Sequence, residues 1–398
     1  MMMMNTHITA ANSSHTTFPE KPPRVLQLCT SNNFGGLEIH FLKFSRWLQQ
    51  RQKQKTDQSA LTENSPNQMV WVATQAESRL AKAIQPALIL KGPFWQRLWQ
   101  LLRFIRQNQI NVIHCHHKRD LLLAVLTKIF SHQPITLIHT RHMQISSSKR
   151  DPYHAFLYGR LDLFIAITEH MQAQAKRFLP LDAQRIQQLY LGAPATHPMS
   201  RDQRIRLRQT LNLTEDTFLV ATISRVEQQK GQHILVDAIE QLHNKNQPIH
   251  GLIVGEIIDD AYAKSLQQHI TQAALPISWL GFRDDVTELI AAADAVCITT
   301  RDETFGLIAI EAMMSKCLTI GADSGGITEI ITHEKTGLLY KTFDAERLAE
   351  TIAYAMQNPE QRQAIAQAGL REATQRFNES TQFEKLLKLI RDTCLHQA

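Results

Sequence analysis

Short apolar runs alternate along the chain with segments in which apolar residues recur every three or four positions. The run at 25–29 predicts a buried strand, and after a loop at 30–36 the apolar residues of 37–48 recur at helical spacing. The same order returns at 218–223, where a loop at 224–231 precedes a second helical pattern. Each half of the chain therefore opens with a strand, a loop that ends in glycine, and a helix.

More apolar runs of this kind predict further strands with helices between them. Strands that alternate with helices indicate βαβ units, and right-handed crossovers assemble such units into parallel sheets. The predicted fold class is α/β, with two doubly wound, Rossmann-like domains. The predicted strands cover 69–73, 112–115, 135–139 and 163–167 in the first half, and 251–254, 277–280, 295–299 and 318–320 in the second.

A chain of 398 residues is too long for one ordinary core, which also predicts two domains. The pattern breaks at a stretch rich in Gly, Ala and Pro after residue 191, so we place the domains at 24–195 and 196–379. A polar stretch at 51–68 predicts a mobile loop. The tail at 380–398 has apolar residues on one face and predicts an amphipathic helix.

Composition indicates a cytoplasmic protein. Hydrophobic residues make up 43% of the chain, but no apolar run approaches the roughly 18 residues that cross a bilayer. Residues 1–23 are polar and lack a basic segment followed by an apolar core, so we expect a disordered lead-in and not a secretory signal. The five cysteines are odd in number and form no C-x-x-C pair, which favours reduced thiols and argues against a zinc site.

Charge is divided unevenly between the halves. Residues 1–195 carry 23 Lys and Arg against 10 Asp and Glu, whereas 196–398 carry 20 against 27. The basic half suggests an anionic partner: a membrane surface, an acidic acceptor or nucleic acid. The segment 91–106 has Trp95 and Trp99 among arginines, so it is either an interfacial helix on an anionic membrane or, as we favour, a helix that covers the first sheet. A helix with its apolar face in the core and its basic face outward would combine the two.

The most informative stretch is 300–313. It follows a predicted strand, at the edge where open α/β sheets bind ligands, and a helix predicted to begin near Thr304 would offer its N-terminal amides to an anion. Glu303 and Glu311 would lie at most roughly 12 Å apart along such a helix, a span that suits two carboxylates on either side of a diphosphate. The alternative for Glu303 is a favourable interaction with the helix dipole alone. Glu311 lies among apolar residues, where a carboxylate is costly unless it is bound.

A second candidate element is the pair of cations in the loop 224–231. Arg225 and Lys230 would suit a diphosphate and would neutralise the charge on a departing nucleoside diphosphate. The alternative is a solvated, charged loop. No G-x-G-x-x-G and no G-x-x-x-x-G-K-[ST] occurs at these openings, which disfavours a dinucleotide-dependent dehydrogenase and a P-loop NTPase.

Together these motifs resemble the retaining glycosyltransferases of family 4, which have the GT-B fold. The resemblance runs from about Arg24 to the end of the chain, and its specific signal is the E-x7-E element Glu303…Glu311 with Phe305-Gly306 inside it. At the start of the linker, just before Gly192, Leu191 stands where the family often has Asn. Other matching segments are 322–330 and 336–339, which continue that element, 224–231 as the phosphate-binding loop, 34–38 as the N-terminal glycine loop, and 190–192 as the start of the linker.

The resemblance implies roles for the matched residues. Arg225 and Lys230 would bind the donor diphosphate, Glu311 the ribose and Glu303 the donor sugar. The donor would lie mainly on the second domain and the acceptor on the first, with the C-terminal helix crossing back to the first. The expected site comprises Glu303 and His142 as catalytic residues; Arg225, Lys230, Glu311, Gly35, Gly36, Phe305, Gly306 and Leu307 as donor-binding residues; and His116 and Phe282 as secondary candidates.

Histidines gather at the ends of two predicted strands. They are either polar residues at a sheet edge or a loosely spaced metal site without acidic partners. The resemblance supports a third interpretation, in which His142 matches the family's histidine near the reacting carbon of the donor sugar and His116 matches a second recurrent histidine. No D-x-D occurs, so we expect no metal and no cofactor, with Arg and Lys in place of the metal. The family is usually discussed as using a front-face mechanism, in which the donor phosphate accepts the acceptor's proton.

The expected function is transfer of a sugar from a nucleotide sugar to a growing, lipid-linked glycan such as lipopolysaccharide core, O-antigen or capsule precursor. The enzyme would be cytoplasmic, with peripheral attachment to the inner membrane through its basic half as a further hypothesis. One rival is a nucleotide-sugar epimerase or hydrolase of the same fold. The other is a basic, non-catalytic binding protein on a degenerate transferase fold, although no nucleic-acid motif accompanies the charge.

Overall fold

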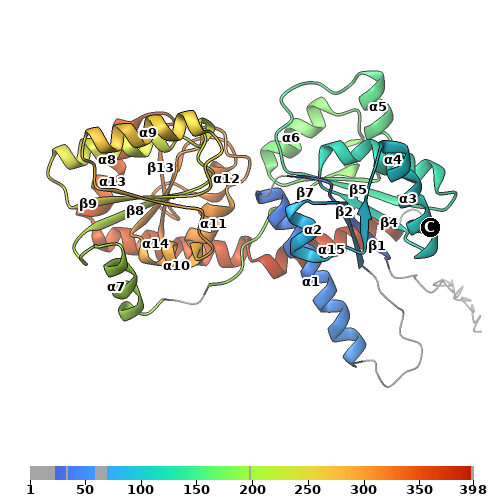
Figure 1. Cartoon of the computed structure of the whole chain (residues 1–398), viewed down its shortest axis with the longest axis horizontal. Coiled ribbons are helices and arrows are strands. Elements are labelled where there is room, and N and C mark those ends of the chain that lie inside the picture. Colours follow the sequence, from blue (N-terminus) through green and yellow to red (C-terminus); the bar gives the residue numbers. More distant parts are fainter. Residues whose placement is uncertain (1–22, 33–34, 59–69, 197–198, 396–398) are drawn as a thin grey trace, which may run out of the picture.

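The computed structural model describes residues 23–32, 35–58, 70–196 and 199–395. Within them, two parallel sheets form the centres of two α/β units that lie side by side (Figure 1). This confirms the predicted fold class. The predicted lead-in at 1–23 lies, except for its last residue, outside the described residues.

The first sheet has seven strands in the order β3-β2-β1-β4-β5-β6-β7, and all its described pairings are parallel. Its order reverses direction between β1 and β4, which makes that point the topological switch of a doubly wound sheet. The strands are β1 Val25–Leu28, β2 Val70–Gln75, β3 Leu88–Leu90, β4 Val112–Cys115, β5 Thr136–Arg141, β6 Leu163–Ala166 and β7 Ile186–Gln188.

The second sheet has six strands in the order β10-β9-β8-β11-β12-β13, again all parallel, with its switch between β8 and β11. Its central strands are buried along their whole length, as expected for a sheet covered on both faces. The strands are β8 Phe218–Ile223, β9 Ile249–Val254, β10 Ile277–Gly281, β11 Ala295–Ile298, β12 Leu318–Ala322 and β13 Leu338–Tyr340.

Helices cover both sheets. Those of the first unit are α1 Gly36–Gln58, α2 Arg79–Ile84, α3 Phe94–Gln107, α4 Leu121–Phe130, α5 Pro152–Tyr158 and α6 Glu169–Phe178. Those of the second unit are α7 Arg201–Thr210, α8 Gln232–Asn244, α9 Asp260–Gln272, α10 Val286–Ala292, α11 Leu307–Met314, α12 Ile327–Ile330, α13 Ala345–Gln357 and α14 Pro359–Arg376. No described helix is long and apolar enough to cross a membrane.

Two local predictions were wrong. Residues 51–58 continue α1 and are not a mobile loop; Arg51 pairs with Glu384 and lies over the ring of Trp47, and 59–69 fall outside the described residues. The helix expected near Thr304 begins at Leu307, because Gly306 before it has a φ of +94°, a left-handed value that a helix cannot contain.

The C-terminal helix α15, Glu379–Leu395, returns to the first unit, as predicted (Figure 1). Phe383 and Ile390 are buried against Val25 and Phe44 of that unit. The chain thus passes between the units twice, and the two passages are paired as a parallel bridge between Ala193 and Asn378.

We predict that Phe383→Ala lowers the melting temperature of the protein markedly. Phe383 is 1% exposed within a core built from both ends of the chain, and truncating a buried Phe costs about 3–5 kcal/mol. Leu395→Ala is the control, because Leu395 on the same helix is 45% exposed. Equal melting temperatures for the two variants would show that the return helix does not stabilise the first unit.

Candidate functional site

A cavity of about 880 Å³ lies between the two units. Its walls come from the carboxyl ends of β8, β9 and β11 and from helix α11 in the second unit, and from Gly35 and helices α1 and α2 in the first. These first-unit elements follow β1 and β2, so both sheets turn their ligand-binding edges toward the cavity. The volume lies in the range of small-molecule sites. Of the predicted site residues, the cavity collects Gly35, Gly36, Arg225, Lys230, Phe282, Glu303, Gly306, Leu307 and Glu311.

Lys230 and Glu303 form an ion pair inside the cavity, with Nζ 2.9 Å from Oε2 and both side chains 19% exposed. Backbone contacts fix the two loops that carry them. Thr299 Oγ1 donates to the carbonyl of Lys230 at 2.7 Å, and a Cβ on Gly231 (φ +69°) would lie 2.5 Å from the carbonyl oxygen of Thr299. The loops after β8 and β11 are therefore packed together, and they hold a cation and a carboxylate at one point.

A second glycine loop holds Glu303 from the other side. The N–H of Gly326 donates to the carbonyl of Glu303 at 2.7 Å, and a Cβ on Gly325 would lie 2.5 Å from the same oxygen. This explains in physical terms why a Gly-Gly sequence follows the E-x7-E element at this spacing.

Glu311 lies in the fifth position of α11 and faces the cavity from the second unit. Burial raises the pKa of its carboxyl; Lys43 lowers that pKa, and Glu379 raises it further. Phe305, in contrast, does not line the cavity: it is 3% exposed and stacks on Tyr190, so its predicted donor contact is not present in this structure.

The remaining predicted residues lie at the cavity rim. Arg225 is 46% exposed and pairs with Glu227 at 2.9 Å. Phe282 is 64% exposed. A Cβ on Gly36 would approach Leu307 only to 3.8 Å, an ordinary contact, so the fold itself does not require glycine there.

His142 and His116 do not line the cavity. They lie 3.3 Å apart, Nε2 to Nδ1, in a buried cluster of imidazoles behind α1 that also contains His40 and His114. Nδ1 of His142 and Nε2 of His40 have no hydrogen-bond partner among the described residues. Burial lowers the pKa of His40 to about 3 and holds the pKa of His142 well below its usual range.

Contacts between the units involve residues that the sequence did not single out. Arg79 makes a bidentate pair with Glu256 at the cavity wall, at 2.9 and 3.0 Å. On another side, the Glu329 carboxylate accepts the N–H groups of Glu169 and His170 at the start of α6, at 2.7 and 2.8 Å. Both join residues about 160 or more positions apart, and no local pattern marks such pairs.

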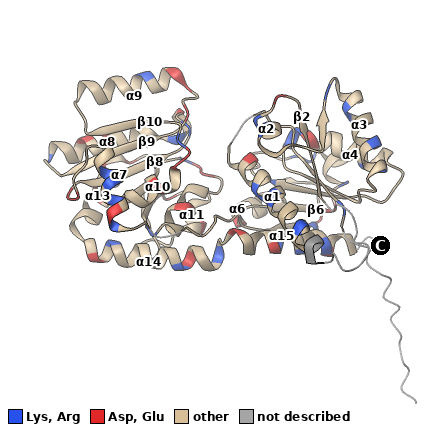
Figure 2. Cartoon of the chain, turned by 60° about the horizontal axis from the view of Figure 1, so that its bottom comes forward, with Lys and Arg blue, Asp and Glu red and all other residues tan. Residues whose placement is uncertain are grey.

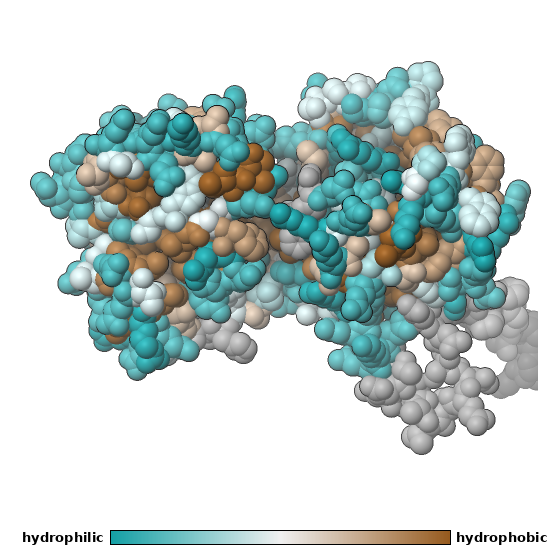
Figure 3. Space-filling model, in the orientation of Figure 1, coloured by the Kyte–Doolittle hydropathy of each residue, from teal (hydrophilic) through white to brown (hydrophobic). Residues whose placement is uncertain are grey.

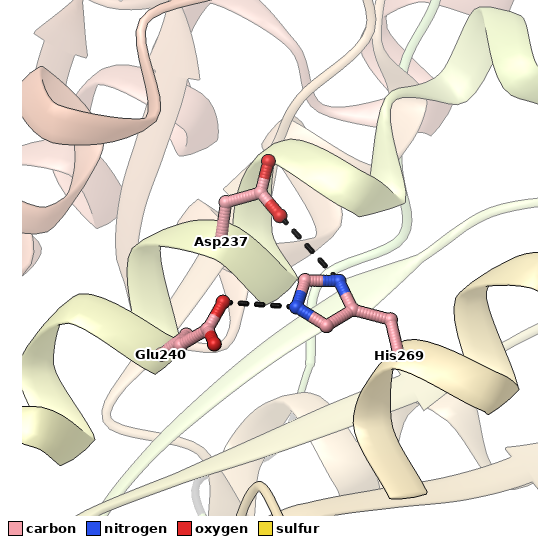
Figure 4. Close-up of side chains that lie close together, drawn as sticks. All are labelled: Asp237, Glu240 and His269. Carbon is pink, nitrogen blue, oxygen red and sulfur yellow. Dashed lines mark hydrogen bonds and ion pairs between the residues drawn. The ribbon is translucent and has the colours of Figure 1, made fainter. Parts of the chain in front are cut away.

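Among the described residues, one group has the composition of a metal site: Asp237 and Glu240 on α8 with His269 on α9 (Figure 4). The imidazole lies between the carboxylates, with Nδ1 3.8 Å from Asp237 and Nε2 2.9 Å from Glu240. Each ring nitrogen of His269 faces a different carboxylate. The arrangement is therefore that of an imidazole that pairs with two carboxylates and links α8 to α9. A metal would need one nitrogen and both carboxylates to converge.

Comparison with known proteins assigns both halves of the chain. A family model described as "Glycosyltransferase Family 4" matches residues 34–196, and one described as "Glycosyl transferases group 1" matches 203–372. A D-inositol 3-phosphate glycosyltransferase of Jonesia denitrificans is 25% identical over 272 residues, 61% of this chain and 63% of that protein, so the match spans less than two thirds of the relative. The lipopolysaccharide core biosynthesis mannosyltransferase LpcC of Rhizobium leguminosarum is 24% identical over 287 residues, 71% of this chain and 78% of that one.

Among solved structures, HepE of Anabaena in complex with UDP and glucose superposes with a TM-score of 0.79. The match covers 92% of this chain and 99% of HepE at 23% identity. Such a likeness concerns the fold, two Rossmann-like units facing across a cleft.

We predict that the protein loses stability as the pH falls below about 6.5, the ordinary histidine pKa. The buried imidazoles have lowered pKa values and stay neutral in the folded state but take up protons on unfolding, so their contribution is present above pH 6.5 and is lost on the way down toward the pKa of about 3 of His40. Each such group steepens the loss by about 1.4 kcal/mol per pH unit.

Melting temperatures measured from neutral to mildly acidic pH test this prediction. His40→Leu should flatten the profile, whereas His243→Gln, at an exposed position, should leave it unchanged. A profile that is flat for the wild type would contradict the assignment of these histidines as neutral.

Proposed function

Because the chain belongs to the family 4 glycosyltransferases, retaining enzymes with the GT-B fold, we propose that it transfers a sugar from a nucleoside diphosphate sugar to a glycan acceptor. The observation that carries the proposal is the convergence of Lys230, Glu303 and Glu311 on one cavity between the two sheets. One cation and two carboxylates on rigid elements match a ligand with a central diphosphate and a hydroxylated group at each end.

The donor would lie along the second unit. Lys230 and Arg225 would bind the diphosphate, together with the N-terminal amides of α11, whose first residue lines the cavity. Glu311 would accept the ribose hydroxyls and Glu303 those of the sugar, because a carboxylate accepts two hydroxyl hydrogen bonds at once. The existing pair with Glu303 keeps the Lys230 ammonium inside the cavity, so it is preorganised for the charge that develops on the leaving diphosphate.

His142 would act on the donor sugar from the first unit. His142 is 8% exposed and lies behind α1 against His40 and His116, so this role requires α1 to move when the donor binds. The acceptor would enter from the side of Gly35 and Gly36. Its hydroxyl would attack on the face from which the diphosphate departs, and its proton would pass to the departing phosphate oxygen. This arrangement retains the anomeric configuration without a covalent intermediate.

We propose a growing bacterial surface glycan as the acceptor. The relatives support this class, since LpcC is named for lipopolysaccharide core biosynthesis. Two groups of donors should be tested. UDP sugars are one, since HepE is described in complex with UDP and glucose, and mannosyl donors are the other, because LpcC is a mannosyltransferase.

We predict that one class of nucleotide sugar stabilises the wild-type protein in EDTA, by about 2.7 kcal/mol at 100 times the Kd. Glu311→Ala should lose the stabilisation, and Glu346→Ala, on the exposed face of α13, should keep it. Thermal shifts with UDP, GDP, ADP and CMP sugars measure both. If no donor stabilises the wild type, the cavity is not a donor site.

The same donor separates the rival activities. An epimerase or hydrolase would consume it without acceptor, whereas a transferase should do so slowly or not at all until a glycan acceptor is added. His142→Ala should then reduce transfer and leave the donor-induced thermal shift in place.

We also propose that the first unit rests on an anionic membrane through α3. The helix buries Leu98, Leu101 and Ile105 against the sheet, while Trp95 is 69% and Trp99 59% exposed. The helix sequence contains no acidic residue. Figure 2 shows basic residues on α3 and on neighbouring α4, and Figure 3 shows apolar and polar residues interspersed over this side of the unit. Exposed indole rings beside cations are the pattern of an interfacial helix.

We predict that phosphatidylcholine vesicles containing phosphatidylglycerol sediment the protein and that pure phosphatidylcholine vesicles do so weakly. Arg97→Gln and Arg103→Gln should each weaken binding about fivefold, and the double change of Trp95 and Trp99 to Ala should abolish it. Tyr354→Ala, at an exposed aromatic of the second unit, is the control. Binding that is indifferent to lipid charge, or a preference for oligonucleotides over vesicles, would contradict this assignment.

A further inference from the structure

Lys43 of the first unit contacts Glu311, a residue of the cavity wall in the second unit. It lies on α1 of the first unit, and its Nζ is 3.2 Å from Glu379 Oε1 and 3.9 Å from Glu311 Oε1. One cation therefore faces two carboxylates: one on the donor-binding wall and one at the first residue of α15.

Glu379 marks the point where the chain crosses between the units. Its N–H donates to the carbonyl of Ala193 at 3.0 Å, and a Cβ on Gly192 would lie 2.5 Å from the Cα of Glu379. The two crossing strands touch there, so they form the natural pivot of any motion between the units. Lys43 thus links this pivot, at Glu379, to Glu311 in the proposed donor site.

The two distances differ in a way that matters for binding. At 3.2 Å, the Lys43 ammonium forms the closer ion pair with Glu379, whose Oε1 has no hydrogen-bond partner among the described residues. At 3.9 Å, it attracts Glu311 without occupying an oxygen lone pair, so both carboxylate oxygens can still accept hydroxyl hydrogen bonds.

Few charges act on Glu311 besides these. Lys43 faces it from α1 and Glu379 from α15, and Glu303 with Lys230 line the same cavity. Helix α14 contacts α11 through Gly369 and Thr374, which are neutral. These two residues lie against Met313 and Met314.

We propose that Lys43 is a positioning residue of the donor site: it keeps the Glu311 carboxylate charged and oriented for the ribose, and it couples that carboxylate to the pivot at Glu379. This inference rests on the proposed donor site. Because the Lys43 ammonium can move closer to one carboxylate only by moving away from the other, Glu379 and Glu311 compete for it, and a change at Glu379 alters the surroundings of Glu311.

The test is the pH dependence of donor affinity, because the ionised Glu311 carboxylate accepts hydroxyl hydrogen bonds at both oxygens and more strongly than the protonated acid does. Burial and Glu379 raise the pKa of Glu311, and Lys43 lowers it. In Lys43→Met the pKa should rise, so binding should fail at a higher pH than in the wild type and be weaker near neutrality by about three- to tenfold. Lys43→Arg should restore most of the affinity.

Glu379→Gln should act in the opposite direction. Removal of this negative charge lowers the pKa of Glu311, so donor binding should persist to a lower pH, and Lys43→Met/Glu379→Gln should fall between the single variants. Lys385→Met, at an exposed cation of α15, is the matched control and should follow the wild type. The proposal would be overturned if the pH dependence of donor binding did not change in Lys43→Met and Glu379→Gln, or if it moved in the same direction in both.

A donor-independent measurement separates this inference from the proposed function. Carbon-13 NMR titration of the Glu311 carboxyl, assigned with Glu311→Gln, should show the same opposed shifts in the two variants without nucleotide. Opposed shifts in a protein that binds no donor would refute the proposed function and leave the electrostatic coupling in place. If the wild type binds a donor but the pKa of Glu311 does not change in the two variants, the proposed function stands and the electrostatic coupling is refuted.

Discussion

The structure depends on one constraint: parallel strands must be joined by crossovers, so every strand-to-helix loop of a sheet emerges at the same edge. Both sheets obey it, and both turn that edge toward the same cavity. Residues as distant in the chain as Gly36, Lys230 and Glu311 are thereby brought to one surface. The chemistry then requires few specialised side chains, because helix amides and buried loops supply the rest of the framework.

The second feature is how the two units are joined. The chain crosses twice at a single touching point, and α15 is anchored in the core of the first unit. Besides that anchor and the stacking of Tyr190 on Phe305, several contacts between the units are polar: Arg79 with Glu256, Glu329 with the start of α6, and Lys43 with Glu311. Polar contacts of this kind exchange readily for contacts with a ligand, so this junction suits units that rearrange during a reaction cycle.

The sequence predicted the parts of the fold that local patterns encode. Buried strands such as β1 and β8 appear as continuous apolar runs, and they were found within a residue or two. The strands that were missed, β3, β7 and β13, are edge strands of three residues each, too short to give such a run. The start of α11 was misplaced because the left-handed φ of Gly306 is a property of the folded loop.

The candidate site likewise contains residues that local sequence patterns reveal and residues that depend on tertiary contacts. Three residues of the cavity wall were recognisable from the sequence, because loops at strand ends carry Lys230 and Glu303, and Glu311 follows Glu303 on α11 at a characteristic spacing. The position of Lys43 was not, because it depends on how one unit meets the other, and a lysine on an amphipathic helix is an ordinary surface residue by its pattern. His142 was expected in the site by resemblance, but burial among other imidazoles separates it from the cavity in this structure.

The central claim is that protein cations, without a metal, hold the donor diphosphate in this cavity. Its most direct test is the affinity of the wild type and of Lys230→Met for the nucleoside diphosphate and monophosphate of the preferred base, measured by calorimetry in EDTA. The account predicts that the wild type favours the diphosphate by about tenfold or more, and that the variant loses most of this preference whether or not magnesium is supplied. A variant that keeps the full preference, or regains it with magnesium, would contradict the account.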